Sequence, residues 1–540
     1  MEESKKQQPG YAKINLGVFW GSAIVCLLFY LPMVIFQKQA QAIIDKLMFV
    51  ITHSTDWLWE IVVFGALIFS MWLALGPYGR VKLGAPDDKP EFKTFTWIAM
   101  MFCGGSGAGL VYWAFIEPIF YLQAPPFWMQ PFSAQAAQWS LSYGIFHWGF
   151  SAWATFAVPA VAFSYMFYVR KKPYLYPSYA CRGVLGNLVD GWVGRVIDAV
   201  VIIGMVGGMA TSLGFVIPML SKLTGDYFGL ADTILLKVIV AVLFSCIYGY
   251  SCYKGLYSGI AKLADYNMYL TFVLLGFVLL AGPTFFMFSL FFDNVGMLLQ
   301  NFIRMSLYTD PITKSGFPQD WTVFYWAWWL AWAIYVALFA TRISKGRTIR
   351  ELVFNMVFSA TAGCALMYLV FGGYNVDQLL NKGVDLAKIL KESGGPAVIS
   401  QVLSSLPFGA IVVPFFIIVM AISQATGVDA ASYTMANMSC VEIREGQEPP
   451  KWSRIFWSFI IFFATVGLLL VGGMKVVQLS SVLTSVPVLF LLVILAISTL
   501  KWLKEDFGNK IESKILTIDY QDFEKSEPVI VKDVTNTSNV

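Results

Sequence analysis

The sequence predicts an all-α, polytopic membrane protein, and three observations lead to that prediction. First, hydrophobic residues make up 58% of the 540-residue chain and charged residues only 13%, about half the charged share of an average soluble protein. Second, twelve apolar runs follow one another along the chain, each of about 20 residues, the length that crosses a bilayer as a helix. Third, positive charges are concentrated in alternate connecting segments, as in loops on the cytoplasmic side.

The twelve predicted spans are centred near residues 26, 66, 108, 155, 208, 241, 276, 331, 361, 417, 463 and 489. The first run, 16–36, is long enough to span and has no small-residue cleavage site behind it, so we expect a membrane helix and not a signal peptide. Lys and Arg cluster at the N-terminus and at 80–93, 170–182, 254–262, 342–350 and 444–454. This alternation places both termini in the cytoplasm, in a multi-pass protein of the cell inner (plasma) membrane.

The composition argues against several other classes of protein. Seven scattered cysteines show no metal-binding spacing, and only two histidines, His53 and His147, are present, which disfavours a metal centre or a hydrolytic enzyme. The chain has no Gly-rich Lys-Ser/Thr loop, so an ATP-driven pump is not expected. The mild net charge of +4 gives no reason to expect a nucleic-acid partner. We therefore expect no enzyme activity and no cofactor, with a sodium ion as the one alternative.

Two segments are too polar to cross the membrane. Residues 292–320 contain a predicted amphipathic helix, 295–305, which we expect to lie on the outer surface. The tail, 504–540, is mixed and slightly acidic, and its distal part is predicted to be disordered.

The most distinctive run is 321–332, which holds five tryptophans in twelve residues inside the eighth span. At about 100° per residue, Trp321, Trp328 and Trp332 fall within roughly 40° of one another on a helix. Trp326 and Trp329 extend this arc by about 60° each. Indole faces are the best protein surface for a quaternary ammonium ion, so the stripe predicts a binding wall. Tight packing between helices is the alternative.

Other segments carry features that a simple lipid-facing span avoids. Residues 104–109 hold four glycines in six positions, which predicts local unwinding around a polar cavity or, alternatively, close helix packing of the GxxxG type. Polar residues at 423–429 predict an interruption of the tenth span. Glu117 is expected to satisfy a helix break and not to hold substrate. Broken helices without an acid–base set indicate secondary transport.

A second aromatic cluster, 147–156, lies in the fourth span, where Trp148 and Phe156 stand about 80° apart on a helix. Further motifs are FYWAWW at 324–329 with ATRISKGRTIRE at 340–351, and the glycine stretch with Glu117-Pro118, HWG at 147–149, ATSLG at 210–214, SYT at 432–434 and EPP at 448–450. Together these motifs resemble those of the betaine/choline/carnitine transporter family. It covers nearly all of residues 15–500. GFPQ at 316–319 and the EPP loop favour the carnitine/γ-butyrobetaine exchanger branch.

The resemblance implies twelve helices with the leucine-transporter type of 5+5 inverted repeat, in a chain that forms homotrimers. It divides the chain into a cytoplasmic N-terminus (1–14), two peripheral helices (15–90), a first repeat of helices 3–7 (91–291), an extracellular surface helix (292–320), a second repeat of helices 8–12 (321–503) and a cytoplasmic tail (504–540).

The resemblance also implies an aromatic box around the substrate's trimethylammonium group. The box residues would be Trp148, Trp153, Trp326, Trp328, Trp329 and Trp332, with Phe120 and Phe156 at positions where relatives carry tyrosine. Choline-carrying members tend to have an aspartate where this chain has Gly109, so we expect a zwitterion such as glycine betaine, carnitine or γ-butyrobetaine. Its carboxylate would meet backbone N–H groups around Ser106, Gly107 and Gly109.

The positions that bind a coupling ion in relatives are altered here. The Thr–Ser pair of sodium-coupled members reads Thr426-Gly427, and two threonines of their second site correspond to Met205 and Met209. Thioether sulfur is a poor ligand for a hard cation. Sodium-independent exchangers place an arginine and a methionine at positions that are Asn267 and Val336 in this chain.

We therefore expect sodium-independent exchange or facilitated uptake. Sodium-coupled symport, at a weakened site near Thr426 with carbonyls from Cys103 to Ser106, is the alternative. An osmolyte sensor built on a transporter scaffold is a remote one, since the sequence offers no output domain.

Overall fold

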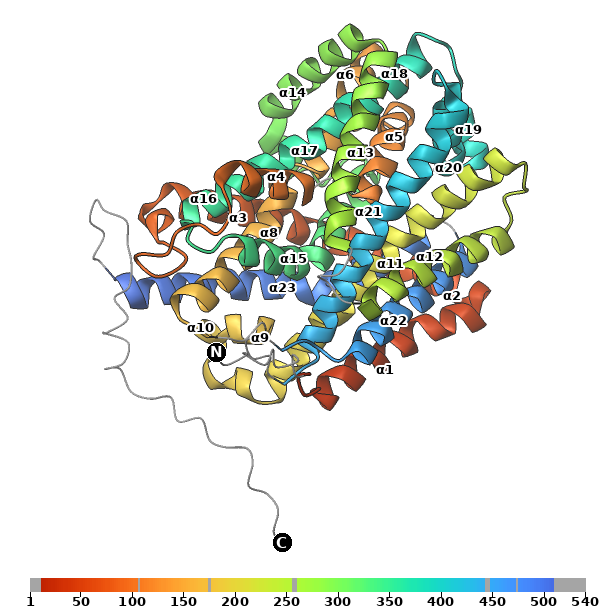
Figure 1. Ribbon diagram of the computed structural model, residues 1–540. Coiled ribbons are helices and arrows are strands. Elements are labelled where there is room, and N and C mark those ends of the chain that lie inside the picture. The colour runs from red at the N-terminus through yellow and green to blue at the C-terminus, as the bar shows by residue number, and fades with distance from the viewer. Residues whose placement is uncertain are drawn as a thin grey trace, which may run out of the picture.

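The computed structural model describes residues 11–104, 107–172, 176–254, 260–441, 447–472 and 474–508, and every named element in those ranges is helical (Figure 1). Within this described part, ten helical segments are long and apolar enough to cross a membrane, and residues 234–250 and 266–281 form shorter apolar helices. The prediction of an all-α polytopic membrane protein is confirmed at this level.

The helices of the first half follow one another with short connections. They are α1 (Leu16–Ile35), α2 (Gln37–Ser54), α3 (Asp56–Leu75), η1 (Pro77–Arg80), α4 (Thr94–Gly104), α5 (Ala108–Gln123), α6 (Ala134–Trp139), α7 (Ser142–His147), α8 (Phe150–Ser164), η2 (Tyr165–Val169), α9 (Pro177–Ala180), α10 (Arg182–Leu185), η3 (Gly186–Asp190), α11 (Trp192–Phe228), α12 (Ile234–Lys254) and α13 (Ile260–Ala281).

The second half begins with α14 and ends with the long helix α23. Its elements are α14 (Thr284–Ser306), η4 (Pro318–Val323), α15 (Phe324–Ile343), α16 (Ile349–Phe354), η5 (Asn355–Ser359), α17 (Ala360–Met367), η6 (Tyr368–Gly372), α18 (Gly373–Leu380), α19 (Leu386–Ser393), α20 (Gly395–Ser405), α21 (Gly409–Met438), α22 (Lys451–Val471) and α23 (Met474–Phe507). Each of the twelve predicted span centres falls on one of these helices.

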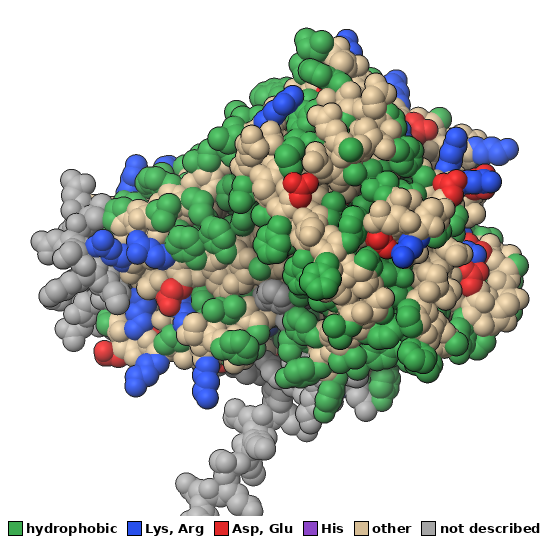
Figure 2. Space-filling model, turned by 90° about the horizontal axis from the view of Figure 1, so that it is seen from above, with side chains coloured by type: hydrophobic (Ala, Val, Ile, Leu, Met, Phe, Trp, Pro, Cys, Tyr) green, Lys and Arg blue, Asp and Glu red, His purple; other side chains and the backbone are tan. Residues whose placement is uncertain are grey.

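The surface supports a bilayer environment. Figure 2 shows apolar side chains over the middle of one face, while Lys, Arg, Asp and Glu gather mostly toward its two opposite ends. Helix α14 adds to this apolar surface: Phe285 and Phe292 are 92% and 67% exposed. The helix begins before the predicted amphipathic segment and is itself long and apolar enough to span, so its placement on the outer surface stays a prediction.

Segments that carry the predicted inside charges are tied to one another. The N-terminal segment pairs with the α21–α22 connection through the bridges Tyr11–Glu448 and Ile14–Cys440. The loop after η1 pairs with the loop before α16 through a bridge between Lys82 and Thr348. Each tie joins two segments that the charge pattern assigns to the same side, as that assignment requires.

The two predicted helix interruptions have different outcomes. Helix α4 ends at Gly104 and α5 begins at Ala108, with the backbone of Gly107 extended (φ −76°, ψ 161°), so a break is present where the four glycines predict one. The expected interruption at 423–429 is wrong, because α21 continues through it as one 30-residue helix. There Thr426 turns its hydroxyl back to the carbonyl of Ser423 (2.8 Å), as hydroxyl side chains do inside helices.

Helix α15, which carries most of the tryptophan stripe, lies inside the bundle. It packs against α8, α11 and α23 (Figure 1). Tyr325 and Trp326 are almost fully buried. Because the helix is enclosed on several sides, the tryptophans of the stripe do not all face the same neighbours.

Candidate functional site

Four aromatic rings from three segments form a contiguous group, here called the ring cluster: Trp148, Phe156, Trp328 and Trp329. The ring centroid of Trp148 lies 5.7 Å from that of Trp328 and 4.6 Å from that of Trp329, with interplanar angles of 83° and 82°. Trp328 and Trp329 are nearly parallel to each other (17°), and Phe156 stands edge-on to Trp329 at 5.7 Å. The group thus presents indole planes in two perpendicular directions.

Backbone carbonyls fix two of these indoles. Trp328 Nε1 donates to the Gly208 carbonyl on α11 (3.2 Å), and Trp329 Nε1 donates to the His147 carbonyl (2.7 Å). Indole N–H groups that are buried normally find such partners. Because the two N–H groups are already bonded, these rings have only their faces and edges left to offer a ligand.

A sharp turn brings Trp148 to the cluster. Helix α7 ends at His147, Trp148 is its C-cap, and α8 starts at Phe150. Gly149 makes the turn possible, since a Cβ there would lie 2.4 Å from the Ile145 carbonyl oxygen. The prediction of one continuous helix through this span is wrong at this turn. The HWG segment was the signal, because glycine interrupts a helix where no side chain fits.

The other predicted box tryptophans lie outside the ring cluster. Trp153 stands behind it: its ring meets Phe156 at 5.2 Å, and its Nε1 donates to the Trp148 carbonyl (3.1 Å). Trp326 faces another way and packs on Phe146, with centroids 5.4 Å apart.

Trp332 and Phe120 are also separate from the ring cluster. Trp332 meets Tyr335 at 5.6 Å and is partly exposed. Phe120 packs on Trp321 at 5.2 Å, in a group of rings that also holds Trp113. Among the ring contacts found in the described part of the chain, none joins Trp332 or Phe120 to a ring of the cluster.

The helix break faces one indole of the cluster. A Cβ on Gly109 would lie 3.4 Å from Trp328 Cη2, so the start of α5 touches that ring. Gly107 is exposed, and as the N-cap of α5 it adjoins the unbonded N–H groups of the first helical turn, which favour anions. Ser106 lies outside the described residues.

The coupling positions of the fifth and tenth spans lie on α11 and α21, which pack against each other. Met205 and Met209 are buried on α11, and Gln424 Nε2 approaches Met209 Sδ at 3.8 Å. Thr426 supplies one hydroxyl oxygen and Gly427 none, and sulfur suits a hard cation poorly. The side chain of Cys103 is outside the described part. This donor set does not fit sodium.

The two remaining coupling positions lie on different helices. Asn267 of α13 is buried, and its Oδ1 has no hydrogen-bond partner among the described residues. Val336 of α15 is partly buried. Neither side chain carries a charge, so neither replaces a coupling cation as an arginine would.

A buried polar network lies beside the ring cluster. Tyr325 of α15 and Tyr368 of η6 donate their hydroxyls to the two carboxylate oxygens of Glu117. Asn375 Nδ2 donates to the Phe115 carbonyl on the same helix as Glu117 (2.6 Å). Glu117 is thus bonded to side chains of two other elements, and its expected role at a helix break stays a prediction.

His147 extends this network toward η4. Its Nδ1 pairs with the Tyr121 hydroxyl and its Nε2 with the Thr322 hydroxyl, both at 3.0 Å. Its ring stacks on Tyr325 at 4.7 Å and 22°. His147 and Tyr325 therefore contact both the ring cluster and the polar network.

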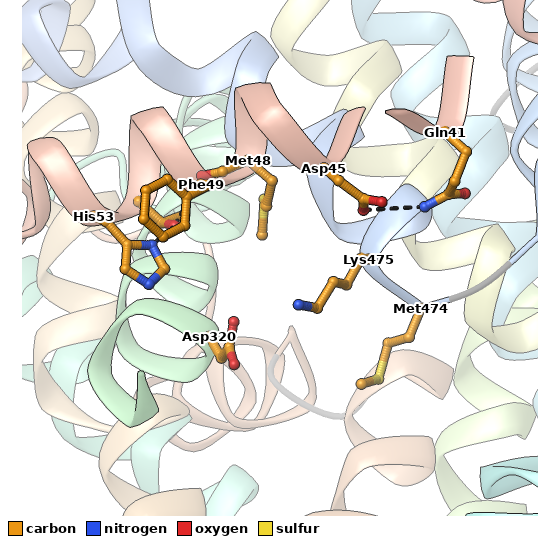
Figure 3. A pocket seen from close by; sticks show the side chains of 9 residues that line it. Gln41, Asp45, Met48, Phe49, His53, Asp320, Met474 and Lys475 are labelled. Carbon is orange, nitrogen blue, oxygen red and sulfur yellow. Dashed lines mark hydrogen bonds between the residues drawn. The ribbon is translucent and has the colours of Figure 1, made fainter. Parts of the chain in front are cut away.

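A charged pocket of about 470 Å³ lies apart from both groups, between α2, η4 and the start of α23. Figure 3 shows Lys475, Asp320 and His53 pointing into this space, with Gln41 hydrogen-bonded to Asp45 (3.1 Å) on its rim. No tryptophan lines it, so it lacks the indole faces that distinguish the ring cluster.

Comparison with known protein families agrees with this chemistry. The model of one family, BCCT, described as betaine/carnitine/choline family transporter, matches residues 17–508. The match takes in every element that contributes to the ring cluster, the helix break and the polar network.

Proposed function

The chain belongs to the betaine/carnitine/choline transporter family and is therefore a transporter and not an enzyme, and on that premise we propose that it imports or exchanges a zwitterionic quaternary ammonium compound. The compound would be of the glycine betaine, carnitine or γ-butyrobetaine type. It would cross by alternating access, with its trimethylammonium group held by the ring cluster.

The ring cluster is the observation that supports this proposal. A cation against an indole face gains about 2 kcal/mol or more when water is excluded, and Trp148 and Trp328 are only 4% and 3% exposed. The centroid distances of 4.6–5.8 Å are those of rings already in contact. Entry of a trimethylammonium group between them thus requires at least one ring to move, as a gated site would.

The glycine break supports a zwitterion over a net cation. Gly109 places no carboxylate beside Trp328, so the protein offers no charge to pair with the ammonium group there. The exposed N-cap Gly107 and the first turn of α5 supply N–H groups for the substrate's own carboxylate. Choline, which lacks that carboxylate, would forgo these contacts.

The architecture proposed for this function has twelve spans in two five-helix repeats, helices 3–7 and 8–12, with both termini cytoplasmic in the inner (plasma) membrane. The proposed assembly is a homotrimer in which α14 takes part. An apolar groove of about 240 Å³ between α14 and its neighbours Phe146 and Phe358 supports a partner on that face.

Counterflow in liposomes tests the proposed substrate. Purified protein in sodium-free vesicles preloaded with glycine betaine, carnitine, γ-butyrobetaine or choline should exchange one of the zwitterions fastest. Trp329→Leu should abolish exchange, and Trp326→Leu, on the same helix but outside the ring cluster, is the matched control. Absence of exchange and binding for all four compounds would remove the proposal.

The same assay separates the alternatives. A sodium-coupled symporter at a site near Thr426 would accumulate substrate only under a sodium gradient, and Thr426→Val would remove that dependence. An osmolyte sensor would bind substrate without any flux. Full exchange in sodium-free buffer excludes both.

A further inference from the structure

The charged pocket between α2, η4 and the start of α23 takes no part in the ring cluster. Its volume of about 470 Å³ is that of a small-ligand site. Element η4 leads into α15, whose last turn carries Arg342 of the predicted inside charges, so the charge pattern assigns this pocket to the outer side. A ligand can therefore reach it from the outer solution or from the outer leaflet.

Opposite charges face one another across this space without touching. Figure 3 shows the amino group of Lys475 and the carboxylate of Asp320 pointing into the pocket, and Lys475 attracts the negative charge of Asp320. None of the ion pairs found among the described residues includes either group. Both side chains are exposed. The pocket thus offers one cation and one anion to a ligand that carries both charges.

Other groups of the pocket already have partners. Gln41 Nε2 donates to Asp45 Oδ1 on the rim (3.1 Å). The ring of His53 stacks on Phe49, with centroids 4.2 Å apart and an interplanar angle of 22°, which covers one face of each ring. The two opposite charges are therefore the main groups left to hold a ligand.

The lining favours an ammonium group that carries N–H bonds. A carboxylate such as that of Asp320 binds a primary ammonium through charge-assisted hydrogen bonds, which a quaternary ammonium cannot form. A quaternary group is held best by indole faces, and no tryptophan lines this pocket. Lys475 suits a phosphate or a carboxylate as a point charge. The matching ligand is a small zwitterion with a primary ammonium at one end and one of these anions at the other.

Two sources supply this chemistry, a free zwitterion in the outer solution and the headgroup of phosphatidylethanolamine. The headgroup is a source because α2 carries exposed apolar side chains at and beside the pocket. Phe49, which lines it, and the neighbouring Val50 are both exposed. The rim therefore adjoins apolar surface of the kind that a bilayer covers.

We propose that this pocket binds a zwitterion with a primary ammonium group, which bridges Asp320 of η4 and Lys475 of α23. The ammonium group donates to the Asp320 carboxylate, and the phosphate or carboxylate of the ligand pairs with the Lys475 amino group. This ligand is distinct from the transported betaine, whose nitrogen has no N–H to donate.

Occupancy of the pocket acts on the outer end of α15. Asp320 lies two positions before Thr322, whose hydroxyl contacts His147 Nε2 (3.0 Å), and the His147 carbonyl holds the N–H of Trp329 (2.7 Å). A ligand that ties η4 to α23 therefore restrains the segment that orients one indole of the ring cluster. Since a ring must move to admit the substrate, the ligand should slow exchange. This consequence rests on the transport function proposed above, whereas the binding itself does not.

Binding is tested on the purified full-length protein with phosphoethanolamine as the probe. Phosphoethanolamine should bind in calorimetric titration and raise the thermal midpoint of the wild type. Asp320→Asn and Lys475→Gln should each weaken its affinity about tenfold, because each removes one charged contact. Asp293→Asn, an exposed carboxyl on α14 outside the pocket, is the matched control and should bind as the wild type does.

Phosphocholine separates this pocket from the ring cluster. It has the same phosphate and carries three methyl groups in place of the N–H bonds. In Trp329→Leu protein, whose ring cluster is impaired, phosphoethanolamine should still raise the thermal midpoint and phosphocholine should not. Equal shifts from both compounds would overturn the requirement for N–H bonds. With wild-type protein alone, excess glycine betaine should leave phosphoethanolamine bound, and complete displacement would overturn the separate site.

Vesicles identify the source of the ligand. Counterflow of glycine betaine is compared in phosphatidylethanolamine and phosphatidylcholine vesicles that contain the same share of phosphatidylglycerol. If the headgroup fills the pocket, exchange is slower in phosphatidylethanolamine, and added phosphoethanolamine slows it only in phosphatidylcholine. If the ligand is a free zwitterion, phosphoethanolamine slows exchange equally in both. Asp320→Asn should remove either effect.

The outcomes keep this proposal distinct from the transport function. No binding of phosphoethanolamine to wild-type protein overturns the site, and so does equal affinity in the wild type, Asp320→Asn and Lys475→Gln. Binding without any effect on exchange overturns the link to α15 and supports the ligand assignment alone. If the protein binds phosphoethanolamine but neither binds nor exchanges any of the four quaternary compounds, the proposed substrate fails and the pocket stands.

Discussion

Tryptophans on two sides of helix α15 have different surroundings. On one face, Trp328 and Trp329 bond their N–H groups to backbone carbonyls and turn their planes toward Trp148. On the other, Trp326 is sealed against Phe146 and its Nε1 has no partner among the described residues. The comparison teaches that tryptophan density does not define a binding site. What each indole faces separates the two groups.

The largest expected effect is on the cluster face. Trp329→Leu removes one indole plane and leaves the His147 carbonyl without its donor, so we expect affinity for the zwitterion to fall about 30-fold, which corresponds to about 2 kcal/mol. Calorimetric titration of purified protein measures it. Trp326→Leu, about 60° further round the same helix and packed on Phe146, should change affinity less than threefold. Equal losses in the two variants would remove the distinction between the two groups of tryptophans.

A charge introduced beside the cluster face should change selectivity. Gly109→Asp points a carboxylate toward Trp328, whose Cη2 would lie 3.4 Å from the new Cβ. Affinity for glycine betaine should drop about tenfold by repulsion of its carboxylate, about 1.4 kcal/mol, while choline gains relative to it. Gly109→Asn has the same shape without the charge. If Gly109→Asn shifts selectivity as much as Gly109→Asp does, crowding of the Trp328 indole is responsible and not the charge.

The contact between α7 and η6, behind the ring cluster, should respond through stability. A Cβ on Gly144 would lie 2.1 Å from Tyr368 Cε1, so Gly144→Ala should cost about 1–3 kcal/mol by overpacking and lower the thermal midpoint by several degrees. Gly427→Ala, where nothing lies within 4 Å of the new Cβ, is the matched control. If Gly144→Ala and the control have the same thermal midpoint, Tyr368 of η6 can move aside for the new methyl group at little cost.

The smallest effect is expected away from both faces, in the loop before η4. Burial opposes the charge of Asp310, but hydrogen bonds from Ser315, Thr313 and Trp128 hold its pKa at about 2. This pKa lies below the usual unfolded value of about 3.9, so its stabilisation is present above pH 4 and is lost as the pH falls toward 2. Asp310→Asn should lower the thermal midpoint slightly at pH 7 and not at pH 2. A pH-independent difference would contradict this assignment.

The sequence predicted the helices well and the site in part. Apolar runs and charge alternation placed every span centre on a helix, because burial in lipid depends on composition over about 20 residues. The stripe singled out Trp328 and Trp329, which lie together in the ring cluster, and their part in binding stays a prediction. It could not show that Trp326 and Trp332 face other neighbours, since helical phase gives direction on one helix and says nothing of which helix stands opposite.

The helix breaks show the same limit. Four glycines at 104–109 were enough to predict a break, whereas 423–429 contains one glycine, and the hydroxyl of Thr426 is satisfied by a carbonyl of its own helix. The turn at Gly149 was overlooked because a single glycine is ambiguous until the Ile145 carbonyl is seen against it. Glu117 lacked any local signal of its tyrosine partners, which lie more than 200 positions further along the chain.

The pairing of the N-terminal segment with the α21–α22 connection has a consequence for biogenesis. Tyr11 is made 437 positions before its partner Glu448. At about 5–20 residues per second, the ribosome needs about 20–90 s to supply it. During that interval α1 must enter the bilayer with its leading segment unpaired. Docking of this segment is thus one of the last steps of assembly, and it marks a nascent chain that has been completed at least through residue 448.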